Sequence, residues 1–82
     1  MTDEQLTNLL QQVAQEYRAE NLDLPELRVT AIRRDGDWLY IAVWPDPQPA
    51  RLYPYYDHLA KLETKLVEEH HVDVLLVPAR AA

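Results

Sequence analysis

The segment that decides the fold reads Leu27-Arg-Val-Thr-Ala-Ile-Arg-Arg-Asp-Gly-Asp-Trp-Leu-Tyr-Ile-Ala-Val-Trp44. Two runs rich in β-branched and aromatic residues flank an Asp-Gly pair, which is the strongest short-range signal for a β-hairpin. Gly36 is the only glycine of the chain, so it is the residue best suited to a tight turn. The segment therefore predicts two antiparallel strands, over about residues 27–33 and 37–44.

Two loop lengths compete for this hairpin. A two-residue loop at Asp35-Gly36 would mix apolar and polar side chains on both faces of the sheet. A three-residue loop, from Arg34 to Gly36, places Arg33 opposite Asp37 and separates the side chains better, so it is the predicted register. In this register, one face is wholly aliphatic and holds Leu27, Val29, Ala31, Leu39, Ile41 and Val43.

An amphipathic helix is predicted before the hairpin, over about residues 3–19. Thr2 and Gln5 have the spacing of a capping box, which stabilises a helix N-terminus. Apolar residues then recur at helical spacing, at Leu6, Leu9, Leu10, Val13, Ala14 and Tyr17. The segment that holds Pro25 ends this helix, because proline has no N–H and disfavours helical backbone in the residue before it.

Three alternating prolines follow the hairpin, in Pro45-Asp-Pro-Gln-Pro49. Because proline cannot donate to a strand ladder, residues 45–49 are predicted to form a stiff connection. A second amphipathic helix is predicted over about residues 54–69, with Leu59, Leu62 and Leu66 on its inward stripe. Residues 72–77 are predicted to form a short strand, which Pro78 ends.

The order helix, strand, strand, helix, strand predicts one α+β domain over residues 1–82. Both helices need an apolar surface, so both are expected to pack on the aliphatic face of a three-stranded sheet, as a two-layer sandwich. Whether the last strand lies beside residues 27–33 or beside residues 37–44 stays open. The order resembles that of KH-like domains, but a single glycine cannot supply their Gly-x-x-Gly clamp, and no family is assigned.

Composition excludes several classes of function. The chain has no cysteine and no serine, which excludes disulfides, zinc–thiolate sites and both of these nucleophiles. One glycine excludes glycine-rich phosphate loops, and a net charge of −6 opposes general binding to nucleic acid. The acidic N-terminus is unlike a signal peptide and no apolar run approaches membrane length, so a cytoplasmic protein without a membrane partner is expected.

The second face of the predicted sheet carries aromatic and basic side chains and has no helix to cover it. A contiguous patch of this kind marks an interaction site, and tryptophan, tyrosine and arginine are typical of binding hot spots. We therefore expect a small non-catalytic interaction module or accessory subunit that binds a second copy of itself or another protein. The predicted contact residues are Arg28, Ile32, Trp38, Tyr40 and Trp44.

Two other functions stay open. The sheet aromatics, with a possible basic patch at Arg33, Arg34 and Arg51, are compatible with a KH-like domain that binds single-stranded nucleic acid, although the net charge disfavours it. A small-ligand-binding or regulatory domain is the other alternative.

Candidates for catalysis and metal binding are few. His70 and His71 are adjacent, so on a helix they diverge by about 100° and do not chelate one ion together. The residues from Tyr53 to His58 include three tyrosines and an Asp-His pair, which could perform acid–base chemistry only inside a pocket. The sequence therefore predicts no enzyme activity, no metal and no cofactor, and it leaves open whether residues 53–58 line a pocket.

Overall fold

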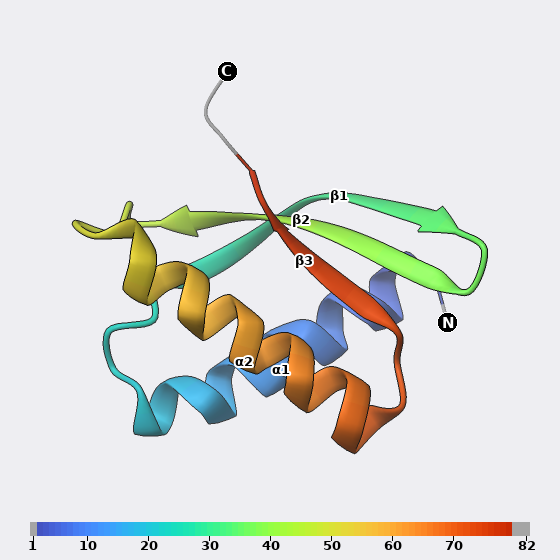
Figure 1. The fold of residues 1–82 in the computed structure, drawn as a ribbon, viewed down its shortest axis with the longest axis horizontal. Coiled ribbons are helices and arrows are strands. Elements are labelled where there is room, and N and C mark those ends of the chain that lie inside the picture. Colours follow the sequence, from blue (N-terminus) through green and yellow to red (C-terminus); the bar gives the residue numbers. More distant parts are fainter. Residues whose placement is uncertain (1, 80–82) are drawn as a thin grey trace.

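The computed structural model describes residues 2–79, which form two helices and three strands (Figure 1). In chain order, these elements are α1 (Asp3–Glu20), β1 (Glu26–Asp35), β2 (Trp38–Asp46), α2 (Leu52–His70) and β3 (Val74–Pro78). The predicted α+β fold and its element order are confirmed.

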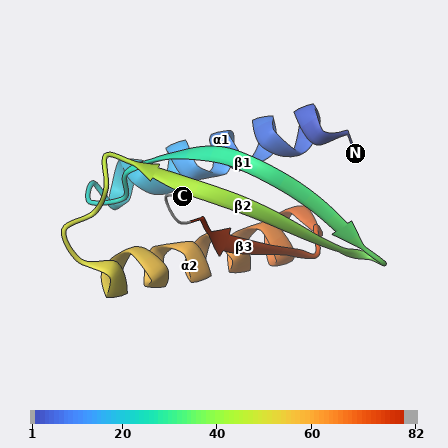
Figure 2. The ribbon, with the colours of Figure 1, turned by 90° about the horizontal axis from the view of Figure 1, so that it is seen from above.

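Both helices lie on one face of the sheet and make the second layer of the sandwich (Figure 1). Seen from above, α1 borders β1 on one side of the sheet, and α2 borders β3 on the other (Figure 2). The opposite face of the sheet carries no element of residues 2–79 (Figure 1). The predicted placement of both helices on one face is therefore confirmed.

The core fills the space between the helices and the sheet. α1 begins with the predicted capping box, in which the Gln5 N–H donates to Thr2 Oγ1 and the Thr2 N–H donates to Gln5 Oε1. Its apolar stripe then meets the stripe of α2 beneath the sheet. The core residues that are at most 3% exposed are Leu6, Leu10, Val13, Ala14, Leu24, Leu27, Ile41, Val43, Tyr55, Leu59, Leu62, Leu66 and Val74.

β2 is the central strand, since the strand order in the sheet is β1-β2-β3. It pairs antiparallel with β1 and parallel with β3. This order answers the question that the sequence left open, because β3 lies beside β2. The connection between these parallel strands contains α2, which supplies the long crossover that a parallel pair requires.

The predicted hairpin register is wrong. Asp35 pairs with Trp38, so the loop consists of two residues, Gly36 and Asp37, instead of the predicted three. Gly36 occupies the first loop position with a φ of 61°, the left-handed backbone region that glycine enters without strain. Glycine at the first loop position is the arrangement of a type II′ turn, whose twist matches that of the flanking strands.

A bulge at Thr30 accounts for the second error in the register. The pairing shifts between Val29 and Ala31, so Thr30 is an extra residue in β1. The bulge turns the following residues over, which puts Ile32 against the core and leaves Ala31 exposed on the other face. The predictions that Ile32 lies on the uncovered face and Ala31 on the covered face are therefore wrong. The two-residue loop brings Ile32 opposite Ile41, and the bulge then brings Val29 opposite Val43, so both aliphatic pairs face the helices.

Candidate functional site

The uncovered face of the sheet carries four of the five predicted contact residues. β2 places Trp38, Tyr40 and Trp44 on this face, because alternate residues of a strand point to the same side. Arg28 of β1 lies opposite Trp44, whereas Ile32 faces the helices. We name this surface the open face; it consists of Arg28, Ala31, Arg33, Asp35, Trp38, Tyr40, Ala42, Trp44, Leu75 and Val77.

Each arginine of the open face lies beside an aromatic residue of β2. The guanidinium carbon of Arg33 lies 5.8 Å from the ring centroid of Tyr40, its cross-strand partner. Arg28 is the partner of Trp44, and its Nη2 lies 3.4 Å from Asp46 Oδ2. Both members of this ion pair are exposed, so the pair adds little to the stability of the fold.

The exposed apolar surface of the open face is contiguous. Trp38 is 44% exposed, Leu75 38% and Val77 41%. Tyr40 pairs with Leu75, and Ala42 pairs with Val77, so β2 and β3 present their apolar side chains next to each other. Such a patch differs from the scattered apolar residues that every protein surface carries.

The three arginines of the possible basic patch are not brought together. Arg33 lies on the open face, whereas Arg34 points to the helix side, where its Nη1 lies 2.6 Å from Asp3 Oδ1. Arg51 is the N-cap residue of α2, and α2 begins at the end of the sheet opposite the β1–β2 turn (Figure 1). The structure therefore gives no basic surface built from all three residues.

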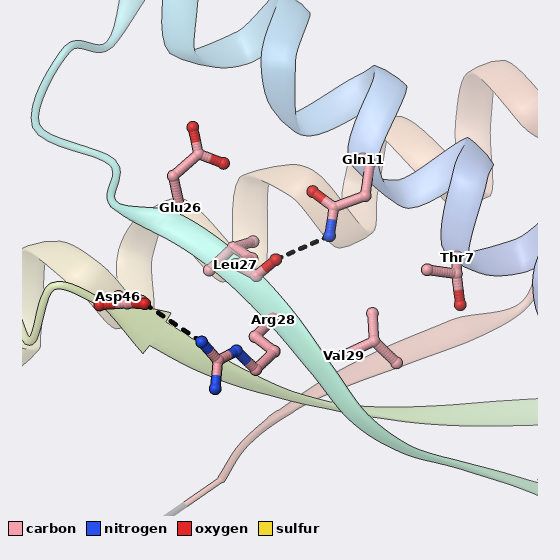
Figure 3. A pocket seen from close by; sticks show the side chains of 7 residues that line it. All are labelled: Thr7, Gln11, Glu26, Leu27, Arg28, Val29 and Asp46. Carbon is pink, nitrogen blue, oxygen red and sulfur yellow. Dashed lines mark hydrogen bonds and ion pairs between the residues drawn. The ribbon is translucent and has the colours of Figure 1, made fainter.

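The outer edge of β1 borders a hollow of about 490 Å³ beside α1 (Figure 3). Gln11 points from α1 into this region, and its Nε2 donates to the carbonyl oxygen of Leu27 over 2.7 Å (Figure 3). The odd-numbered residues of β2 turn their backbone groups to β3, as the bonds at Leu39 and Val43 show. Leu27 is opposite Pro45, so its carbonyl points away from β2 and receives no ladder hydrogen bond. The Gln11 side chain of α1 thus donates to a backbone carbonyl at the outer edge of β1.

A side chain of α2 also forms a hydrogen bond with the backbone at the outer edge of β3. The Leu39 N–H donates to the carbonyl of Asp73, so the odd-numbered residues of β3 bond to β2 and the even-numbered ones face outward. The N–H of Leu76 accordingly points away from β2 and donates to Glu63 Oε1 on α2 over 2.6 Å. Burial raises the pKa of Glu63, and the hydrogen bond from Leu76 opposes this shift.

A chain of polar groups, buried at Tyr17 and His58 and exposed at Asp23, joins the two helices and the loop between α1 and β1. Tyr17 Oη lies 2.5 Å from His58 Nδ1, and His58 Nε2 lies 2.9 Å from Asp23 Oδ2. An ionised Asp23 can only accept, so His58 Nε2 donates to it; in a neutral ring with this tautomer, Nδ1 accepts from the Tyr17 hydroxyl. The hydrogen bond to His58 lowers the pKa of Asp23, and burial raises the pKa of Tyr17.

Sequence reasoning missed this chain because its members are separated by up to 41 positions. It considered His58 together with the neighbouring Asp57, but the carboxylate of Asp57 pairs with Lys61 at 3.0 Å. His58 is 8% exposed and its ring nitrogens are both engaged, so the arrangement serves the packing of the helices.

Residues 53–58 do not line one pocket. Tyr53 is 89% exposed, whereas Tyr55 is buried in the core. Tyr55 and Tyr56 line a hollow of about 430 Å³ together with Trp44. Among the described residues, Tyr55 Oη finds no hydrogen-bond partner, and burial raises the pKa of Tyr55 to about 12.

Comparisons with protein families, curated proteins and solved structures gave no match for this chain. Within residues 2–79, no group of three or more His, Asp or Glu side chains is placed to hold a metal ion. In the same part of the chain, no helix combines the length and the apolar character that a membrane span needs. The case for a function therefore depends on the surfaces themselves.

Proposed function

We propose that this protein is a non-catalytic interaction module that binds a second copy of itself through the open face. The contiguous exposed surface of Trp38, Leu75 and Val77 is the observation that carries this proposal. Apolar patches of this kind, rimmed by polar side chains, commonly mark protein–protein contacts. Trp38, Tyr40 and Trp44 supply the apolar contact area, and Arg28 and Arg33 form the rim.

The side chains at the sheet edges support a contact through the face. An unprotected edge strand is a template for pairing with another chain. The Gln11 amide donates to the Leu27 carbonyl on β1, and the Glu63 carboxylate accepts from the Leu76 N–H on β3. The bulge at Thr30 further disrupts the regular spacing of β1. In the free chain, these contacts disfavour pairing between the sheet edges of two copies, so two copies meet with their open faces together.

The charges of the open face favour a second copy over nucleic acid. The chain has a net charge of −6, which repels phosphates. On the open face, Arg28 is balanced by Asp46, and Arg33 lies over Tyr40. Two such faces therefore approach each other without a strong like-charge contact, although the whole chains repel each other at low salt.

The size of the sheet predicts a weak dimer. The strands hold 10, 9 and 5 residues. At about 3.3 Å per residue and about 4.8 Å between strands, they cover a flat area of about 400 Å². Two such faces give about 800 Å² before the relief of the side chains is added, which is below the roughly 1,200 Å² at which standard specific interfaces begin. We expect a dissociation constant on the order of micromolar to millimolar.

Intrinsic fluorescence tests this proposal, because both tryptophans of the chain lie on the open face. Dilution from about 1 mM to about 1 μM should move the tryptophan emission to longer wavelength as the indoles meet water. Added salt should favour the dimer by screening the repulsion between chains, whereas contacts with nucleic acid weaken in salt. Emission that does not change with protein concentration contradicts the proposal.

A further inference from the structure

A groove runs between the outer edge of β3 and α2. It consists of three hollows of about 230, 250 and 430 Å³ that share lining residues. Glu63 lines the first two, while Tyr56 and Pro78 line the last two. The hollows therefore follow one another along β3, where α2 borders the sheet (Figure 2).

The groove holds a backbone donor that a further strand can use by displacing the carboxylate of Glu63. The even-numbered residues of β3 turn their N–H and C=O groups away from β2. Leu76 is the central one of these residues, and its N–H donates a hydrogen bond to the carboxylate of Glu63 over 2.6 Å. This oxygen occupies the position that the carbonyl of an added strand would take. Pro78 ends the usable edge because it has no N–H.

The charges of the groove specify the partner. Glu63 and Glu68 line the hollow that also contains Trp38, and within the described chain no Lys, Arg or His lines any of the three hollows. A strand that takes the Leu76 N–H releases the Glu63 carboxylate, which then needs a cation. The ring of Trp38, 44% exposed, offers the same cation a π surface.

We propose that the β3–α2 groove binds an extended peptide segment with alternating aliphatic and basic residues, which adds to β3 as a fourth strand. A backbone carbonyl of the peptide replaces Glu63 on the Leu76 N–H. The aliphatic side chains of the added strand turn to α2 and fill the hollow between Leu59 and Leu76. The basic side chains alternate with them and turn to the other face, where one meets Trp38 and Glu68, which line the same hollow. The groove shares Trp38, Trp44 and Leu75 with the open face. The proposal does not depend on self-association, because its backbone contact lies at Leu76 on the outer edge of β3.

The test uses the synthetic peptide acetyl-Val-Arg-Val-Arg-Val-amide and amide NMR spectra of the ¹⁵N-labelled protein. The peptide should shift the Leu76 amide resonance and leave the resonances of β1 unchanged. The Glu68→Gln variant should bind it about two- to fivefold more weakly, which is the effect of losing one exposed ion pair. Glu16→Gln, which removes the same charge from an exposed position of α1, should bind like the parent protein.

Three results would overturn the proposal: no shift at β3 up to about 1 mM peptide, equal binding of acetyl-Val-Glu-Val-Glu-Val-amide, or shifts confined to β1 and to Tyr40 and Ala42 of β2. The Tyr40→Ala variant separates the two surfaces. It removes an aromatic ring of the open face that does not line the groove, so it should weaken self-association and leave peptide binding intact.

Discussion

The imidazole of His58 on α2 is hydrogen-bonded to the hydroxyl of Tyr17 on α1, with 2.5 Å between His58 Nδ1 and Tyr17 Oη. The two rings meet edge to face at 76°. Asp23 holds the far nitrogen of the imidazole at 2.9 Å and fixes its tautomer. One side chain of α2 thereby ties α1 and the following loop to the core.

Replacing Asp23 by asparagine should make the stability of the fold less dependent on acid pH. The pKa of Asp23 is lowered by His58, so its contribution is present above its ordinary pKa of 3.8 and is lost as pH falls through the lower, folded value. Thermal unfolding followed by circular dichroism should show a lower Tm for Asp23→Asn at pH 6, with the gap closing below pH 3.8. The same pattern in Asp37→Asn, at the exposed hairpin turn, would contradict this explanation.

The Glu63→Gln substitution should act in the opposite direction. Burial raises the pKa of Glu63 above its ordinary 4.5, so its stabilising contribution is present below that pH and is lost as pH rises through the folded pKa. Glutamine keeps an acceptor for the Leu76 N–H and carries no charge. We expect a higher Tm for Glu63→Gln than for the parent at pH 7, and equal values at pH 4. A lower Tm at pH 7 would show that the charge itself stabilises the edge.

His71 should be replaceable by glycine with a gain in stability. It follows α2 with a φ of 55°, and this left-handed backbone costs a non-glycine residue about 1–2 kcal/mol. His71→Gly should therefore raise the free energy of unfolding by about 1 kcal/mol, measured by urea denaturation. His70→Gly is the matched control, because His70 is still helical and glycine there costs about 0.5–1 kcal/mol. Equal effects of both substitutions would contradict the assignment.

Because of the bulge at Thr30, lysine substitutions at two neighbouring residues should have different effects on the free energy of unfolding. Ile32 packs against the core, so Ile32→Lys should lower the free energy of unfolding by more than about 2 kcal/mol. Ala31 is exposed, so Ala31→Lys should change it by no more than about 0.5 kcal/mol. The continuous ladder predicted from the sequence requires the reverse order, so urea denaturation of the two variants decides between the registers.

The sequence was sufficient for the element order and for the helices, because period and capping are local properties. The capping box of Thr2 and Gln5 and the apolar stripe of α1 illustrate this point. The predicted register of the hairpin was wrong for two reasons. An Asp-Gly pair is compatible with more than one turn, and a bulge cannot be recognised from the alternation of one strand until its partner is paired with it. Trp38, Tyr40 and Trp44 were nevertheless placed on the correct face, because β2 is a regular strand.

The long-range polar contacts had no signal in the sequence. Glu63 resembles the other charged residues of α2, and only the position of β3 shows that its carboxylate meets the Leu76 N–H. Gln11 likewise resembles a solvent-facing residue of α1 until β1 lies beside it. The side chains that close the sheet edges therefore became visible only from the fold.

The mass of the protein in solution, measured by sedimentation equilibrium at about 10–500 μM, tests self-association through the open face most directly. The parent protein should pass from the 9.6 kDa monomer towards twice that mass as concentration rises. The Trp38→Ala/Tyr40→Ala variant should stay monomeric, and Tyr53→Ala, which removes an aromatic ring that is 89% exposed elsewhere, should behave like the parent. A parent protein that stays at 9.6 kDa throughout, or a double variant that associates equally well, would contradict the proposal.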